Sequence, residues 1–216
     1  MATKLIWRGP GQPSVDLNGK IRDKKIVGRQ KLMKRESTDL TESLKHDLQI
    51  RQAKISDARR IAEIHVDTWR AAYRGQMPDA VLEALDVEKR AILWAKLLAD
   101  QKHRIFVAEA IMDIIGFCDL MPSRDPDADS KMTAELVAIY VHPNHWRKGA
   151  GRALCHRALD TARFDNFTAV TLWILASNKP ARNFYEAMGF SLDGANKVDR
   201  SFNNHELHEE RFRISI

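Results

Sequence analysis

The sequence predicts an α/β fold, because strand-like runs alternate with amphipathic helical segments along most of the chain. Two runs, residues 136–141 and 169–175, are short and almost wholly apolar, as expected for buried strands. Each is followed by a segment whose apolar residues recur at helical spacing. Two further runs, residues 104–110 and 114–120, flank a short turn and predict a hairpin.

The residues before the hairpin predict one strand and then a helical region. Apolar and polar residues mix over residues 48–53 in a way that predicts a first strand. A long helix follows, with Ser56 as its expected N-cap. The helix breaks at residues 73–78, and a second helical region follows over residues 82–98.

The turn after the first buried run has a composition suited to a phosphate. Gly149 and Gly151 let a ligand approach the backbone closely, and free N–H groups at a helix N-terminus attract anions. A dinucleotide fingerprint needs three glycines after an early strand, and a P-loop needs Gly-Lys-Ser/Thr; the turn has neither. Three cations add to the positive field of this turn: Arg147, Lys148 and Arg152.

The last third of the chain predicts a short helix and a final strand. Pro180 stands near the expected start of the helix, and Gly189 stands just past its end. Alternating apolar residues over residues 206–216 predict the final strand. Loops are expected at residues 73–78, 122–133 and 193–204.

Two motifs, in this order, resemble the signatures of the GNAT acetyltransferases. The acyl-CoA motif of that family reads Gln/Arg-x-x-Gly-x-Gly/Ala, and residues 146–151 fill it as Trp-Arg-Lys-Gly-Ala-Gly. Trp146 is the one departure, since the family usually has Gln or Arg there. Residues 178–190 match the second signature, Asn-x-x-Ala-x-x-x-Tyr-x-x-x-Gly-Phe, at every fixed position. The resemblance covers residues 48–216 and none of residues 1–47.

The resemblance implies an α/β (α+β) fold with a mixed, mostly antiparallel sheet flanked by helices. Two parallel strands, residues 134–141 and 169–175, would splay apart, and the pantetheine arm of acetyl-CoA would enter the gap and complete their hydrogen bonding. Arg182 would contact a CoA phosphate, or else be a solvated helix residue. The implied cofactor-binding residues are Ile139, Tyr140, Val141, Trp146, Arg147, Lys148, Gly149, Ala150, Gly151, Arg152, Asn178 and Arg182.

Acetyl transfer to an amine needs a neutral amine, a donor for the thioester oxyanion and a proton for the leaving thiolate. The resemblance places Tyr185 beside the CoA sulfur as the acid; the alternative is an aromatic core residue. Glu135 is the candidate general base, because a carboxylate within an apolar strand suits proton abstraction. Its alternatives are an anchor for the substrate ammonium and a solvated strand-end residue. Direct attack in a ternary complex needs no covalent enzyme intermediate.

No metal is expected, because the histidine pairs lack the His-Glu-x-x-His pattern. These pairs are His142 with His145, and His205 with His208. The cysteines Cys118 and Cys155 read as reduced core thiols.

Charge and length separate the chain into two parts. Residues 1–47 hold 11 Lys or Arg and 6 Asp or Glu, so +5 of the formal net charge of +6 belongs to this basic extension. We expect an irregular arm packed on a partner, or a tether to RNA or another acidic partner; nucleic acid is otherwise not expected. No run approaches the roughly 18 apolar residues of a membrane span, and no signal peptide is visible, so a cytoplasmic enzyme is expected.

The sequence therefore predicts a GNAT-like domain at residues 48–216 that moves an acetyl group from acetyl-CoA to an amine. An acetyltransferase for protein N-termini or lysines is one alternative, and a non-catalytic acyl-CoA sensor is another. Retention of both Tyr185 and Glu135 argues against the sensor. The acceptor and the oligomeric state, including a homodimer, stay open.

Overall fold

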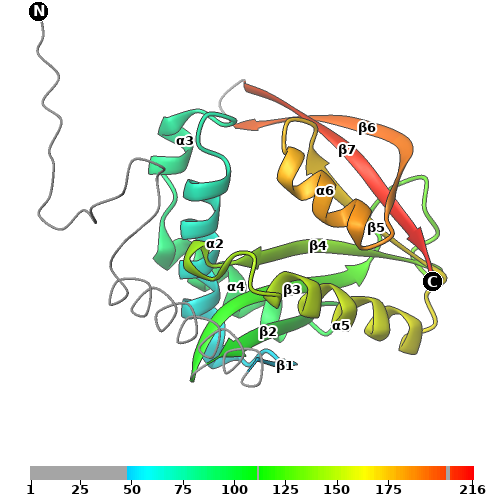
Figure 1. The fold of residues 1–216 in the computed structure, drawn as a ribbon, viewed down its shortest axis with the longest axis horizontal. Coiled ribbons are helices and arrows are strands. Elements are labelled where there is room, and N and C mark those ends of the chain that lie inside the picture. The colour runs from blue at the N-terminus through cyan, green and yellow to red at the C-terminus, as the bar shows by residue number, and fades with distance from the viewer. Residues whose placement is uncertain (1–47, 111, 203–204) are drawn as a thin grey trace, which may run out of the picture. The chain divides into compact units, whose positions relative to one another are not determined.

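A computed structural model describes residues 48–110, 112–202 and 205–216, so the expectations for residues 1–47 lie outside the described residues. These described residues form a seven-stranded sheet in the order β1-β2-β3-β4-β5-β7-β6 (Figure 1). Every neighbouring pair is antiparallel except β4 with β5, which is parallel. The strands are β1 (Gln49–Gln52), β2 (Arg104–Ala110), β3 (Asp113–Pro122), β4 (Thr133–Val141), β5 (Ala169–Leu175), β6 (Ser191–Phe202) and β7 (His205–Ser215).

Helices cover both faces of the sheet. One face packs against α5 (Ala150–Phe164) and α6 (Lys179–Ala187), which lie toward the viewer in Figure 1. The other face packs against α2 (Ala58–Ala72) and α4 (Val87–Ala99). The short α3 (Asp79–Glu83) adds a small cluster with the carboxyl end of β5 and the start of β7. The predicted mixed, mostly antiparallel sheet between helices is confirmed.

The long predicted helix begins later than its expected cap. Ser56 lies inside a single 3₁₀ turn, η1 (Ile55–Asp57), and not at the start of α2. Asp57 is the N-cap residue instead, and its carboxylate accepts from the Lys54 amide at 2.8 Å. Arg51 holds the same carboxylate at 2.7 Å, so this end of α2 is tied to β1.

Two predictions, for the second helical region and for the last loop, were wrong in detail. The second helical region is two helices, because α3 ends at Glu83 and α4 begins anew after Asp86, whose carboxylate caps it by accepting from the Glu88 and Lys89 amides. The expected loop at residues 193–204 is largely strand β6, paired with β7. Its sequence is polar because it is an edge strand with exposed side chains, so hydropathy gives no strand signal.

The predicted hairpin of β2 and β3 is confirmed. Its turn contains Met112 in the left-handed region at φ +65°, and Ala110 pairs with Asp113 beside it. Further along, β3 meets β4 with one irregularity. Asp119 pairs with Ala138 and Leu120 pairs with Leu136, so Val137 is an extra residue on β4.

The parallel pair β4–β5 holds together over three residue pairs only. Thr133 to Glu135 pair with Ala169 to Thr171, and beyond Glu135 the two strands diverge (Figure 1). From there β4 continues on β3, and β5 continues on β7. The predicted splaying of these strands is confirmed, and we call the divergence beyond Glu135 the fork.

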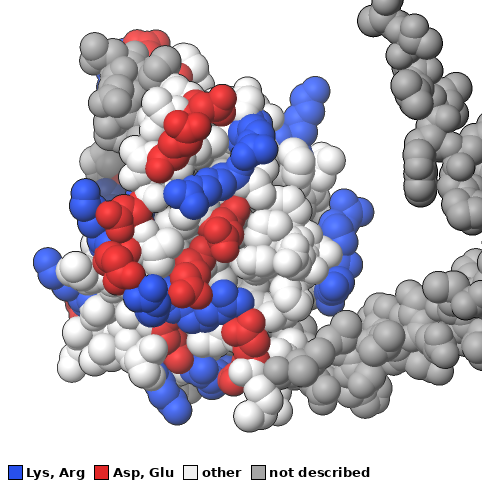
Figure 2. Space-filling model, turned by 90° about the vertical axis from the view of Figure 1, so that its left-hand side faces the viewer, with Lys and Arg blue, Asp and Glu red and all other residues white. Residues whose placement is uncertain are grey.

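Charges of both signs mix on the surface seen in Figure 2, where blue and red side chains alternate without a broad area of one sign. Ion pairs at the surface of the described residues include Arg59 with Glu88 and Arg60 with Asp113, each at 2.7 Å. Within the described residues, no helix is both long and apolar enough to cross a membrane.

Candidate active site

The start of α5 has the open backbone that the glycine motif predicts. Gly149 occupies the N-cap position at φ +96°, and no side chain within the described chain caps the helix. Arg147 is also left-handed, at φ +63°, and Lys148 donates to the Asn144 carbonyl at 3.0 Å, which shapes the turn. The first amides of α5 therefore face outward with an exposed cationic turn beside them, a geometry that suits a phosphate.

Gly151 lies where α5 meets the fork. A Cβ atom there would meet the Phe184 ring of α6 at 3.7 Å and Cγ2 of Val141 at 3.9 Å. These are ordinary contact distances, so the glycine sits against both β4 and α6 without a side chain of its own. Its backbone can be approached closely by a ligand that runs between α6 and β4.

Along the end of β4, the backbone N–H and C=O groups of every second residue point toward the fork. His142 donates to Ile115 of β3 at 2.8 Å, and the alternation of an antiparallel ladder then turns Tyr140 toward β3 as well. Ile139 and Val141 face the fork. The structure thus places two of the three predicted backbone positions on the fork edge, and the third, Tyr140, on the β3 side.

The carbonyl of Val141 already has two donors. The Thr68 hydroxyl of α2 donates to it at 3.1 Å, and the Trp146 indole N–H donates to it as well. The family motif has Gln or Arg at the position of Trp146, and here the indole joins the turn to the end of β4. Thr68 was not predicted, because its hydroxyl is one polar atom on an otherwise apolar helix face and gives no sequence signal.

Tyr185 lies buried on the face of α6 that packs against the sheet. Its ring packs against Phe184 and Phe190, with ring centroids 5.0 and 5.7 Å away. Burial raises the pKa of its phenol above the usual value, so the phenol keeps its proton in the free protein. Tyr140 packs on the opposite face of the sheet and adds to the same upward shift of the pKa.

Glu135 is buried at the last paired position before the fork. Its neighbours Ala134 and Leu136 belong to the core under α5, so the Glu135 side chain faces the other side of the sheet. Arg124 binds both carboxylate oxygens, with Nε to Oε2 at 2.9 Å and Nη2 to Oε1 at 2.5 Å. This hydrogen bonding raises the pKa of Arg124. Arg124 was not predicted as a site residue.

The two remaining predicted residues serve the helix α6 and the sheet. Asn178 is the N-cap of α6, and its side-chain oxygen accepts from the Ala181 amide at 3.1 Å. Arg182 pairs with Glu210 of β7 and lies over the Phe212 ring. The structure therefore places Arg182 against β7 rather than at the start of α5.

A cluster on the same face as Glu135 links the loop after β3 to β5 and β7. Asp125 accepts from the Trp173 indole at 3.0 Å and from Arg211 at 3.1 Å. Arg211 is buried and also binds Asp127 and Asp193, each at 2.7 Å. The loop at residues 122–129 is thus fixed across β4, β5 and β7. Only its mixed charge, already visible in the sequence, indicated a polar surface.

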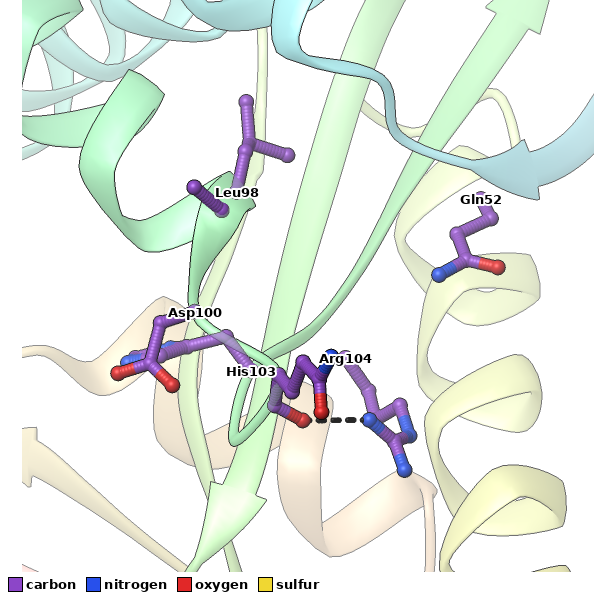
Figure 3. Close-up of a pocket in the computed structure, with 7 residues that line it drawn as sticks. Gln52, Leu98, Asp100, His103 and Arg104 are labelled. Carbon is purple, nitrogen blue, oxygen red and sulfur yellow. Dashed lines mark hydrogen bonds between the residues drawn. The ribbon is translucent and has the colours of Figure 1, made fainter.

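Two surface hollows lie away from the fork. One, of about 280 Å³, is lined by the end of α4, the start of β2 and the end of β1, with Leu98, Asp100, His103, Arg104 and Gln52 around it (Figure 3). The other, of about 410 Å³, lies at the carboxyl end of α5, opposite to Gly149. Neither includes a predicted site residue. Among the described residues, no group of three or more His, Cys, Asp or Glu side chains could hold a metal ion.

Comparison with known proteins identifies the class. The model of a family described as "Acetyltransferase (GNAT) family" matches residues 59–190. This match and the fold define an acyl-CoA-dependent acetyltransferase. The chain belongs to the GNAT family of acetyltransferases.

Relatives and solved structures agree with that assignment. The uncharacterised N-acetyltransferase YuaI of Bacillus subtilis is 30% identical over 139 residues, 64% of this chain and 77% of that protein. The L-amino acid N-acyltransferase MnaT of Escherichia coli is 28% identical over 145 residues, 66% of this chain and 79% of that protein. The fold is similar to that of the acetyltransferase YncA of Salmonella typhimurium, solved with acetyl-CoA, at a TM-score of 0.60 and 22% identity, covering 78% of this chain and 94% of that chain.

Proposed function

We propose that this protein transfers the acetyl group of acetyl-CoA directly to a primary amine in a ternary complex. The observation that carries the proposal is the fork. An uncapped helix start lies at one side of it, the unpaired backbone edge of β4 borders it, and α6 carries a buried phenol, that of Tyr185, on the face that packs against the sheet. These features match the phosphate, amide and thioester parts of one elongated molecule.

Each part of acetyl-CoA would meet a different group. The pyrophosphate binds the first amides of α5, with Arg147, Lys148 and Arg152 contributing positive charge. The pantetheine amides bond the edge of β4 at Ile139 and Val141. Because the carbonyl of Val141 already accepts from Thr68 and Trp146, its amide and the groups of Ile139 are the positions proposed for this contact.

The reaction joins the amine nitrogen to the acetyl carbon and breaks the carbon–sulfur bond. An ammonium first loses a proton to become nucleophilic, since a protonated amine has no lone pair to attack with. As the intermediate collapses, the nitrogen gives its second proton to a water molecule and the departing thiolate takes a proton from Tyr185. The tyrosinate then takes the second proton back from that water, so that only the first proton is released to solvent. Glu135 would accept the first proton and pass it to solvent, or anchor the ammonium while water accepts it.

A small amine is the proposed acceptor. The relative MnaT is named for acting on L-amino acids, which supports a small acceptor with an α-amine. An acetyltransferase for protein N-termini or lysines is the second candidate. Such an enzyme would have the same acetyl-CoA site at the fork. Its acceptor site would differ only on the face of the sheet that carries Glu135 and the loop at residues 122–133.

The proposal is tested by titrating the protein calorimetrically with acetyl-CoA and CoA, and then measuring thioester consumption over a panel of amines and amine-bearing peptides. Binding followed by turnover on small amines is the expected result. Binding with turnover on peptides alone would favour the protein acetyltransferase, and binding without any turnover would favour the sensor. A protein that binds neither acetyl-CoA nor CoA would contradict the proposal.

A further inference from the structure

Arg124 and Glu135 form an ion pair that is buried on one side and open on the other. The Glu135 side chain is 6% exposed, whereas that of Arg124 is 57% exposed. Nε and Nη2 of the guanidinium are directed at the carboxylate. Among the described residues, no acceptor bonds the remaining nitrogen, Nη1. The guanidinium therefore covers the carboxylate and presents its other edge outward.

The position of this pair matters because Glu135 marks the start of the fork. It occupies the last position at which β4 and β5 are paired. Its side chain lies on the face opposite to α5 and α6, so an amine that reaches the fork from that face meets the Arg124–Glu135 pair first. Asp125, next to Arg124, accepts from Trp173 of β5, two residues beyond the Glu135–Thr171 pair, and so fixes this part of the loop beside the start of the fork.

Glu135 is buried, and Arg124 is the one cation that forms an ion pair with it among the described residues, so removing Arg124 alone would leave a buried charge unpaired at a large cost. An incoming ammonium could replace the guanidinium on Glu135. Arg124 would then need an anion of its own to remain paired. A molecule that carries an ammonium and a carboxylate a few bonds apart supplies both partners at once, and the exchange leaves no charge unpaired.

We propose, on the basis of the acetyltransferase function proposed above, that the acceptor is an α-amino acid with a free carboxylate and that Arg124 determines this specificity. The guanidinium leaves Glu135 to bind the substrate carboxylate in two hydrogen bonds. Glu135 then receives the substrate ammonium, directly beside the fork. An amine without a carboxylate offers Arg124 no other anion. Arg124 then stays bound to Glu135, and the amine has to compete with the guanidinium for the two carboxylate oxygens of Glu135.

The exchange of partners on Glu135 also makes proton transfer depend on binding of the substrate carboxylate. The ammonium of the amino acid gives one proton to Glu135, and its nitrogen then attacks the thioester carbonyl as described above. While Arg124 occupies the carboxylate, Glu135 can accept no proton from an amine. The carboxylate of the correct substrate therefore makes the base available, which couples recognition to proton transfer.

The test compares matched acceptors on the full chain. L-methionine, L-leucine and L-phenylalanine are screened first, and the best of them is compared with its carboxamide and its decarboxylated amine. Rates are corrected for the fraction of neutral amine, because the α-amine of an amide is less basic. We expect kcat/KM for the free acid to exceed that of both analogues by at least about 100-fold, since a site built to hydrogen-bond a substrate group can reject an analogue without that group by up to about 10⁴–10⁵-fold.

The Arg124→Gln variant is expected to reduce this preference to about threefold or less, because no guanidinium then binds the substrate carboxylate. Arg124→Lys keeps the charge without the two-pronged geometry and is expected to fall between the two. Arg163→Gln is the matched control, since it removes an arginine from the exposed pair with Asp160 on α5 and should leave the preference unchanged. Unaltered acetyl-CoA affinity, measured by calorimetry, shows that each variant is folded.

Two results would overturn the inference while leaving the acetyltransferase intact. One is equal turnover of the acid and its carboxamide by the wild type. The other is an undiminished preference for the acid in Arg124→Gln. Absence of turnover on every amine and peptide would instead overturn the proposed function itself, and this inference with it.

Discussion

The indole N–H of Trp146 and the hydroxyl of Thr68 donate to the same oxygen, the carbonyl of Val141 at the end of β4. One donor comes from the turn before α5 and the other from α2, on the opposite face of the sheet. The end of β4 is therefore held from both sides. This places the backbone edge at the fork in a fixed position before any ligand arrives.

Removing these donors singly and together should give a non-additive loss of stability. Trp146→Phe and Thr68→Val are each expected to lower the free energy of unfolding by about 1 kcal/mol, because one donor still bonds the carbonyl. The double variant should lose more than the sum, because the carbonyl then has neither donor. Urea denaturation of the four proteins measures this. Strict additivity would mean that the two bonds act independently.

Tyr185→Phe tests the proposed acid. The ring contacts with Phe184 and Phe190 survive the change, so folding and acetyl-CoA affinity should stay close to those of the wild type. Turnover should fall by more than tenfold, a loss of about 1.4 kcal/mol or more in the transition state. Single-turnover kinetics with calorimetry separates the two quantities. A variant that turns over at the wild-type rate would remove Tyr185 from the mechanism.

The two glycines at the start of α5 should respond differently to alanine. Gly149→Ala places a side chain at φ +96° and should lower the free energy of unfolding by about 1 kcal/mol or more. Gly151→Ala introduces only ordinary contacts with Phe184 and Val141, so its stability should stay near the wild-type value. Thermal denaturation of both variants makes the comparison.

Aspartate at either glycine should abolish CoA binding, through steric block and repulsion between its carboxylate and the phosphates. The measurement is calorimetric titration with CoA, with Gly151→Ala as the control for Gly151→Asp. Normal CoA affinity in either aspartate variant would place the phosphate site elsewhere on the molecule.

The pair of His103 and Asp119 predicts a pH-dependent stability. His103 Nδ1 lies 2.8 and 2.9 Å from the two carboxylate oxygens of Asp119, and this hydrogen bonding raises the pKa of His103. Asp100 adds to the rise and Arg124 opposes it. The folded state therefore holds the imidazole proton more tightly than the unfolded state does. The stabilisation is fully present below the ordinary pKa of 6.5 and is lost as the pH rises through the raised value.

The ionised carboxylate of Asp119 is the group that holds the proton on His103, so the loss of stability is expected above the ordinary pKa of the imidazole. We expect the urea midpoint of the wild type to fall between about pH 6 and about pH 9. His103→Gln should show a smaller fall over the same interval. Parallel pH profiles for the two proteins would show that the pair does not titrate there.

The sequence predicted the parts of the fold that carry a hydropathy period or a motif. The runs at residues 104–110 and 169–175 became strands with those limits, because their apolar residues are buried. Gly149 and Gly189 have the positive φ that glycine at helix ends suggests. Strand β6 was missed, since an edge strand gains its stability from backbone pairing with β7 rather than from buried side chains.

Within the candidate site, the sequence predicted only those residues that belong to a recognisable motif. The glycine turn and Tyr185 were found through the motifs that contain them. Arg124 was not, because its partner Glu135 lies across a loop and no spacing in the sequence connects the two. Thr68 was missed for the same reason, since its acceptor is a backbone carbonyl 73 positions away.

The short junction of three residue pairs between β4 and β5 also determines how firmly the two parts of the sheet are joined. The seven strands amount to two smaller sheets, β1–β4 and β5–β7, hinged at residues 133–135 and 169–171. A molecule whose amides bridge the two edges would act as an additional strand and lock the hinge. The bound molecule would then be a structural element of the working enzyme, and the empty protein would be the less rigid of the two states. Amide hydrogen exchange along both strand edges should become slower once the gap is filled.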